Sequence, residues 1–105
     1  MSETKFLVKY SIKEEHEKNF LKLIRELKSL INAEGLVDYS VFVDSKNKLA
    51  YTEVYTFESK EAYDNYDDEA DERVNILMSK MSEFVAEKTT KYSVINKVDL
   101  ATGDE

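Results

Sequence analysis

The sequence predicts an α+β domain in which two helices pack on one face of a four-stranded antiparallel sheet. The hydrophobic pattern switches between the two-residue period of a strand and the period of about 3.6 residues of a helix, in the order β-α-β-β-α-β. A length of 105 residues fits one domain. No proline, internal repeat or linker interrupts the pattern. We therefore expect residues 1–105 to form a single domain.

The first two elements are a strand and an amphipathic helix. Side chains alternate from Lys5 to Ile12, as in a strand buried mainly on one face. From Glu14 to Ala33 the apolar residues recur at helical spacing, and acidic residues crowd the first turn, where the helix dipole stabilises them. Gly35 follows where a left-handed cap would end this helix.

A β-hairpin comes next. Leu36 to Val43 alternates as a second strand, and the polar segment Asp44 to Lys48 has the length of a hairpin loop. The third strand, Leu49 to Phe57, should therefore pair antiparallel with the second.

Two helical segments follow the hairpin. Ser59 is placed to cap a short helix that runs through Tyr66. A longer helix, capped by Asp67 or Asp68, is expected to continue to about Lys88, because apolar residues recur there at helical spacing.

Thr90 to Val98 alternates as the last strand and completes the split βαβ order of ferredoxin-like sheets. In that order both helices cover one face of the sheet.

The helices should cover the face with the larger apolar side chains: Phe6, Val8, Tyr10, Tyr39, Tyr51, Tyr55 and Val94. The opposite face carries Leu7, Phe42, Val54 and Ile95 among Thr, Ser and Lys. That face is too apolar to stay in water, so we expect the sheet of a partner chain to cover it.

The net charge of −7 is concentrated in one segment. Residues 58–72 hold eight acids and one base, which leaves the rest of the chain neutral. No basic stripe remains to follow a phosphate backbone or an anionic membrane, so neither nucleic acid nor membrane is an expected partner. The sequence has no cysteine, no apolar run long enough to cross a bilayer and no signal-like N-terminal stretch, so a cytoplasmic location is the default expectation.

Glu53 is the first candidate for a functional residue, because it lies between Tyr51 and Tyr55 on an apolar strand face. A buried carboxylate must be paired, protonated or in contact with a wet cavity. A raised pKa would suit a general base that removes a phenolic proton, with Tyr55 beside it. The alternatives are a structural carboxylate held by a tyrosine hydroxyl, or a carboxylate turned outward at the rim of the sheet. We expect Glu53 to face a cavity shared with Tyr51, Tyr55 and Asn96.

Several further side chains are candidates for binding a substrate. The hydroxyls of Tyr39, Tyr51 and Tyr66 could orient an aromatic ligand, although tyrosine is also an ordinary strand residue. Asn96 is polar on an apolar strand face and could bind a carbonyl or peroxide oxygen, or satisfy a backbone group. His16 borders the apolar stripe of the first helix and could shuttle a proton, although such histidines are more often surface residues.

The acidic run offers oxygen ligands that suit calcium. It lacks the loop glycine and the ligand spacing of an EF-hand, and helix capping explains its charges with fewer assumptions. We therefore expect no metal site.

The third strand and the helix start after it carry a family resemblance. The segment Glu53-Val54-Tyr55, followed by Ser59-Lys60-Glu61-Ala62-Tyr63, resembles the antibiotic biosynthesis monooxygenase domains of the dimeric α+β barrel superfamily. The resemblance implies a homodimer with facing sheets and a pocket between sheet and helices in each subunit. It also implies an oxygenase that needs no cofactor and acts on quinols or polyketide aromatics, or one that degrades haem.

Two positions depart from that family pattern. Tyr55 stands where family oxygenases often have tryptophan, and Tyr66 stands where they often have histidine. The only histidine, His16, lies on the first helix, which disfavours the haem-degrading alternative.

Two functional hypotheses follow. In the first, the protein is a monooxygenase of a small aromatic or quinol-type molecule, without metal or flavin. Glu53 is the base, and Tyr51, Tyr55 and Asn96 orient the substrate. In the second, the same dimer and pocket bind a small molecule without turnover, as in a binding or stress-response protein.

Overall fold

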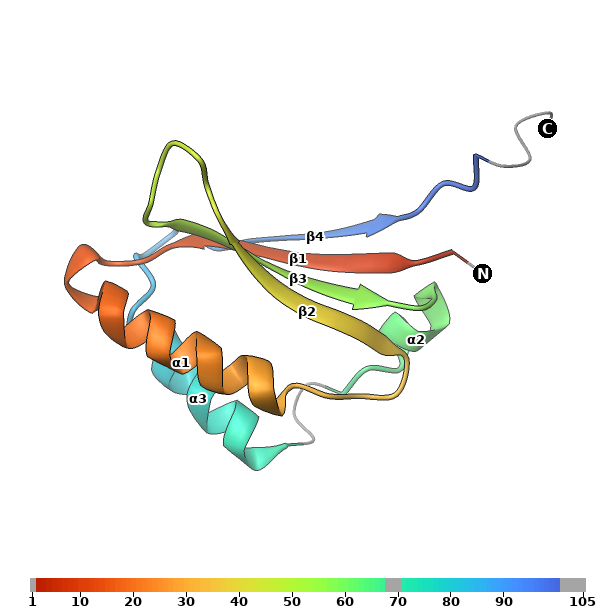
Figure 1. The fold of residues 1–105 in the computed structure, drawn as a ribbon, viewed down its shortest axis with the longest axis horizontal. Helices are drawn as coiled ribbons and strands as arrows, with labels where there is room; N and C mark the ends of the chain where they lie inside the picture. Colours follow the sequence, from red (N-terminus) through yellow and green to blue (C-terminus); the bar gives the residue numbers. More distant parts are fainter. Residues whose placement is uncertain (1, 68–70, 101–105) are drawn as a thin grey trace.

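The computed structural model, which describes residues 2–67 and 71–100, has the expected order of elements (Figure 1). The strands are β1 (Thr4–Ser11), β2 (Leu36–Val43), β3 (Ala50–Phe57) and β4 (Lys91–Asn96). The helices are the 3₁₀ turn η1 (Glu14–His16), α1 (Glu17–Leu30), α2 (Lys60–Asp64) and α3 (Glu72–Ser82). The strands form one sheet in the order β2-β3-β1-β4, and all three pairings are antiparallel. The predicted α+β, ferredoxin-like fold is confirmed.

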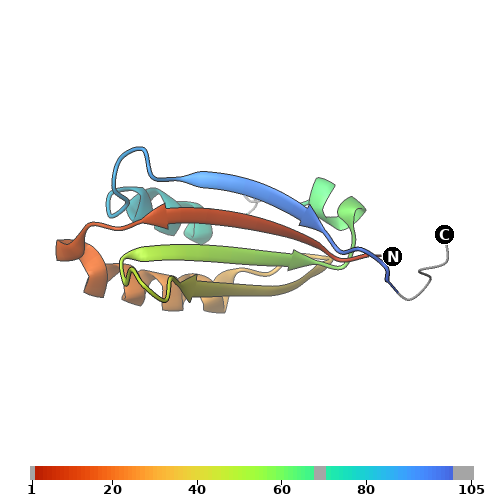
Figure 2. The same cartoon turned by 90° about the horizontal axis from the view of Figure 1, so that it is seen from above.

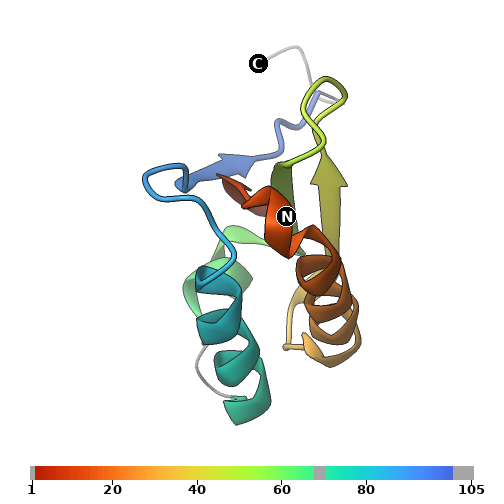
Figure 3. The same cartoon turned by 90° about the vertical axis from the view of Figure 1, so that its left-hand side faces the viewer.

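Both long helices lie on the same side of the sheet. Seen from above, α1 lies beneath β2 and β3, whereas α3 lies on the β4 side (Figure 2). The view along the helices shows α1 and α3 side by side beneath the sheet (Figure 3). The core fills the space between α1 and the sheet, where Phe20 and Leu27 meet Tyr10, Tyr51 and Phe57, all buried.

The helices cover less of the sheet than the sequence predicts. All six residues of β4 are exposed, including Val94, which was expected to be buried and is 41% exposed. The physical reason is that α1 packs under β2 and β3, and α3 packs mainly against α1, so β4 lies at an edge without a helix pressed on it. The opposite face of the sheet carries the apolar residues that the sequence placed there, with Phe42 and Ile95 exposed and Leu7 and Val54 half-buried.

The helix boundaries also differ. The α3 helix ends at Ser82, not near Lys88, because the backbone after it pairs with the end of β1: the Lys13 N–H donates to Phe84 O (2.8 Å) and the Ala86 N–H to Ser11 O (2.8 Å). The N-cap of α3 is Asp71, whose carboxylate accepts hydrogen bonds from the N–H groups of Arg73 and Val74, so the cap is not Asp67. The other predicted cap, Asp68, lies outside the described residues.

The remaining boundaries shift by a few residues. The α1 helix ends at Leu30, before the expected Ala33. The β4 strand stops at Asn96, because its partner on β1, Thr4, is the first residue of that strand. Ser59 is confirmed as the cap of α2, since its Oγ accepts from the Ala62 N–H at 3.1 Å. None of the helices within the described ranges is long and apolar enough to span a membrane.

Gly35 is left-handed, with φ of 83°, as predicted. It lies in the turn that leads into β2, after the helix has already ended, where the Leu36 N–H donates to Ala33 O. A β-carbon on Gly35 would lie 2.5 Å from the β-carbon of Ala62. This position therefore requires glycine for both its backbone angle and its close approach to α2.

Replacing Gly35 with alanine should lower the free energy of unfolding by about 1–3 kcal/mol, because the new β-carbon meets both a strained φ and a steric clash. Urea unfolding at matched protein concentration measures the change. The neighbouring exposed variant Glu34→Ala is the control and should unfold like the wild type. An unchanged midpoint for Gly35→Ala would contradict the assigned conformation.

Candidate active site

Glu53 lies in the middle of the sheet and is almost fully buried, with 2% of its surface exposed. It is on β3, an inner strand, and faces Val8 on β1 and Val41 on β2 in the pairing register. An ionised carboxylate in such a place costs several kcal/mol unless charged or polar partners offset the lost hydration. The partners of Glu53 therefore decide what it can do.

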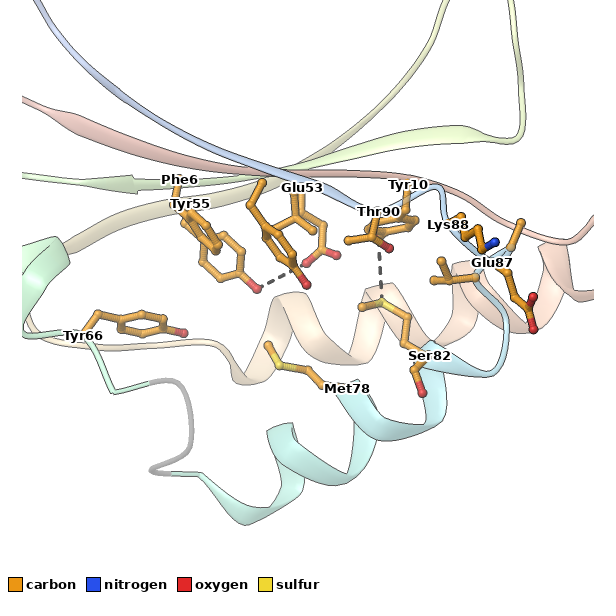
Figure 4. A pocket seen from close by; sticks show the side chains of 15 residues that line it. Phe6, Tyr10, Glu53, Tyr55, Tyr66, Met78, Ser82, Glu87, Lys88 and Thr90 are labelled. Atoms are coloured by element: carbon orange, nitrogen blue, oxygen red, sulfur yellow. Dashed lines mark hydrogen bonds between the residues drawn. The ribbon is translucent and has the colours of Figure 1, made fainter.

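Those partners are tyrosines. The register places Tyr10 on β1 and Tyr39 on β2 at diagonal positions beside Glu53, on the same face of the sheet. The Tyr39 hydroxyl donates to Glu53 Oε1 at 2.8 Å. The Tyr55 hydroxyl donates to the same oxygen at 3.3 Å (Figure 4). Three strands thus each bring one tyrosine hydroxyl toward a single carboxyl group.

Burial raises the pKa of Glu53 above its ordinary value, although hydrogen bonds from Tyr10, Tyr39 and Tyr55 oppose that rise. Burial, together with the nearby carboxylate, also raises the pKa of Tyr10 and of Tyr39, so both hydroxyls stay neutral donors. No ion pair among the described residues involves Glu53. A carboxyl held by neutral donors, with a raised pKa, is suited to accept a proton from a weak acid such as a phenol.

A pocket of about 460 Å³ opens beside Glu53, within the usual size for a small-molecule site. The sheet forms one wall, and α3 and the segment after it form the other (Figure 4). The wall residues are Phe6, Val8, Tyr10, Glu53, Tyr55, Tyr66, Met78, Met81, Ser82, Val85, Ala86, Glu87, Lys88, Thr90 and Tyr92. Most of them are aromatic or apolar, so the pocket suits a small aromatic molecule better than a highly polar one.

The structure gathers some of the sequence-predicted site residues around this pocket. Glu53, Tyr55 and Tyr66 line it together. Tyr39 binds Glu53 but does not line the pocket. Tyr51 lies on the same strand face, as expected, but its ring packs on Phe20 at 4.6 Å, away from the pocket.

Asn96 and His16 lie outside the pocket. Asn96 is at the end of the sheet, where its Oδ1 accepts a hydrogen bond from the Thr4 hydroxyl at 2.7 Å. Asn96 lies on the same face of β4 as Tyr92, but the two residues are four positions apart along the strand and so have different neighbours. The His16 ring packs 5.0 Å from that of Phe84, beyond the pocket wall.

Sequence reasoning missed several parts of the pocket wall, among them the segment after α3, which the sequence assigned to a helix. Tyr10 was assigned only to the covered face, yet its hydroxyl also contacts Met81 Sδ at 3.7 Å and so links β1 to α3. Met78 and Met81 are one helical turn apart, a spacing that the sequence shows. What the sequence does not show is that this turn of α3 lies across from Glu53.

No group of three or more side chains suited to hold a metal ion occurs within residues 2–67 and 71–100. Part of the acidic run, residues 68–70, lies outside these ranges.

The fold and the pocket define a small α+β protein in which Glu53 is the one buried acid among the described residues. Residues 6–72, more than half of the chain, match the antibiotic biosynthesis monooxygenase family. The chain therefore belongs to that family. No curated protein matches it.

Solved structures share the fold at low identity. A conserved protein from Methanosarcina mazei Go1 is 20% identical, with a TM-score of 0.77, over 93% of this chain and 95% of the other. A crystal structure of an antibiotic biosynthesis monooxygenase is 23% identical, with a TM-score of 0.68, and the match covers 91% of this chain and 97% of the other. SnoaB, a cofactor-independent oxygenase from Streptomyces nogalater, is 9% identical, with a TM-score of 0.73, and the match covers 94% of this chain and 96% of SnoaB.

The raised pKa of Glu53 predicts how stability depends on pH. The folded protein holds this proton more tightly than the unfolded chain, whose ordinary pKa is 4.5. The proton on Glu53 therefore contributes its full share to the free energy of unfolding below pH 4.5, and this contribution is lost as the pH rises through the pKa of Glu53 in the folded protein. Glu53→Gln mimics the protonated carboxyl and should therefore gain stability relative to the wild type as the pH rises.

Urea unfolding of both proteins from about pH 4 to about pH 8, at fixed protein concentration, measures this difference. The exposed variant Glu15→Gln controls for the loss of one acid. A difference between Glu53→Gln and the wild type that stays constant with pH would contradict the raised pKa.

Proposed function

We propose that the protein is a cofactor-independent monooxygenase of a small aromatic or quinol-type molecule, with Glu53 as its base. The observation that carries this proposal is a buried carboxyl with a raised pKa, held by neutral tyrosine donors and facing a largely aromatic pocket. Membership of the antibiotic biosynthesis monooxygenase family supports it, and the similar fold of SnoaB, a cofactor-independent oxygenase, agrees with it.

The first step is a proton transfer. A substrate hydroxyl, or an acidic carbon next to a carbonyl, gives its proton to Glu53, and the substrate becomes an anion. Tyr10 and Tyr55 line the pocket beside Glu53. Once Glu53 is protonated it no longer carries a charge for their hydroxyls to stabilise, so each hydroxyl can turn its single hydrogen toward the substrate anion. Tyr39 does not line the pocket, so it positions Glu53, and Tyr66 contributes to the wall that contacts the ring.

The second step uses dioxygen. The substrate anion supplies electrons to dioxygen, and one oxygen atom enters the product while the other leaves as water with two hydrogens from the substrate. The electron-rich anion is itself the reductant, so the balance needs no further electron donor. Tyr51, Asn96 and His16 lie outside the pocket, and we assign them no part in these steps.

A second function, ligand binding without turnover, is favoured by one observation. The only histidine of the chain packs on Phe84 outside the pocket, so the pocket lacks an imidazole to move protons. In this alternative, Glu53 and its tyrosines only bind the hydroxyl of the ligand.

Oxygen uptake with a panel of hydroquinones separates the two functions. The enzyme should consume oxygen, and Glu53→Gln should lower turnover by about 10²- to 10⁴-fold, because general-base catalysis is lost while the shape of the side chain is kept. Glu15→Gln, on the surface, is the control and should keep full turnover. A ligand-induced rise in melting temperature without oxygen uptake would favour the binding function, and full activity of Glu53→Gln would contradict the assigned base.

We further propose that a second copy of the chain covers the open face of the sheet. This face exposes Phe42 and Ile95, with 58% and 50% of their surfaces in water, and leaves Leu7 and Val54 half-buried. An apolar face of this kind is commonly buried in an interface. The isologous contact of a two-fold dimer would bury the same residues from both copies.

The assembly proposal predicts a dimer at micromolar concentration, measured by sedimentation. Val54→Lys should give monomer or aggregate, because it would bury a charge without a partner at the centre of the interface. Ile76→Lys on α3, which also replaces an exposed apolar side chain, is the control and should leave the dimer intact. A monomeric wild type would exclude the interface.

A further inference from the structure

The segment between α3 and β4, residues 83–90, forms one end of the pocket. Its backbone is tied to the end of β1: Val85 pairs with Ile12, and the Ala86 N–H donates to Ser11 O. The Thr89 hydroxyl donates to Ala86 O at 2.7 Å and accepts from the Ser11 N–H at 3.1 Å. These bonds hold the turn from Ala86 to Thr89 in one conformation at the pocket mouth.

Lys88 lies in this turn with a φ of 63°. Among the described residues it is the only one other than glycine in the left-handed region. Glycine or asparagine adopts this region with less strain than lysine. Because the backbone alone would favour another residue, the lysine side chain is a candidate for function.

The position of Lys88 along the pocket indicates that function. Figure 4 shows Lys88 and Glu87 at one end of the pocket and Tyr66 at the other, with Glu53 between them. Lys88 is exposed and takes part in none of the ion pairs among the described residues. Lys88 is the one basic residue among the described residues that line the pocket.

We propose that Lys88 binds an anionic substituent of the ligand, so that the pocket prefers aromatic acids. The ring would lie along the apolar wall with its hydroxyl at Glu53 and its carboxylate toward Lys88. Glu87 lines the same end of the pocket and repels that carboxylate. Lys88 therefore strengthens the binding of an aromatic acid, and Glu87 weakens it. This inference rests on the proposed function, since it requires that the pocket binds a small aromatic molecule.

A matched pair of probes tests the proposal: a hydroxynaphthoic acid with its two groups on opposite rings, and the methyl ester of that acid. Their dissociation constants are measured at low and at high salt. Lys88→Asn removes the charge and suits the left-handed backbone, and Lys88→Gly is a second variant with the same two properties. Lys48→Asn, in the exposed turn of the β2–β3 hairpin, is the control for net charge.

In both Lys88 variants the acid should bind about two- to fivefold more weakly while the ester is unchanged, the size expected for one exposed ion pair. Glu87→Gln should strengthen binding of the acid, and high salt should reduce all of these differences. The Lys88 variants should melt no lower than the wild type, since their backbone is less strained.

Two outcomes overturn the inference in different ways. If acid and ester both bind but their ratio is the same in the wild type, in Lys48→Asn and in the Lys88 variants, Lys88 does not select the ligand and the proposed function stands. If neither probe nor plain naphthol binds the wild type, the proposed pocket function fails, and the role of Lys88 fails with it.

Discussion

The site depends on one arrangement, in which a buried carboxyl is held by tyrosine hydroxyls from three adjacent strands. Moving a carboxylate out of water costs several kcal/mol, whereas each hydrogen bond to a charged group contributes about 1.5–3 kcal/mol. The hydroxyls of Tyr10, Tyr39 and Tyr55 therefore offset much of the cost but not all of it, in agreement with the raised pKa of Glu53. A cation in their place would have lowered this pKa and made the carboxylate a weaker base.

This arrangement also explains why the core is so rich in tyrosine. The three hydroxyls converge on Glu53 from rings that belong to the core: the ring centroids of Tyr39 and Tyr55 lie 4.9 Å apart, and the ring of Tyr10 packs edge-on against Phe20. Phenylalanine would fill the same volume but would leave the carboxyl without donors. The same side chains thus contribute to the apolar core with their rings and to the site with their hydroxyls.

The pocket exists because the helices do not cover the whole of the sheet face on which they pack. The α1 helix packs on β2 and, through the rings of Phe20 and Tyr51, on β3. The α3 helix packs mainly on α1, and a pocket remains between α3 and strands β1, β3 and β4. The hydroxyl of Tyr10 reaches across this space to Met81, and the turn at Lys88 closes one end of it. The pocket is therefore bordered by groups that differ in character along its length, from aromatic at Tyr66 to charged at Lys88.

The order of elements, the face of the sheet that the helices cover and the expected burial of Glu53 follow from local periodicity, but the extent of the cover does not, since Val94 on that face is 41% exposed. Alternation obliges Glu53 to share a face with Tyr51 and Tyr55 once that strand is placed under the helices. Cap and turn residues likewise act locally, so Ser59 and Gly35 were predictable, although the end of α3 was not, because pairing with β1 ended it.

Only the tertiary structure decided which residues meet at the site. Strand order places Tyr10 and Tyr39 beside Glu53, and these neighbours come from strands far apart in the sequence. The position of α3 brings Met81 to the pocket, while the packing of α1 draws Tyr51 toward Phe20 and the end of the sheet leaves Asn96 with Thr4. A sequence pattern determines which face a side chain is on, but the contacts between elements determine what that side chain touches.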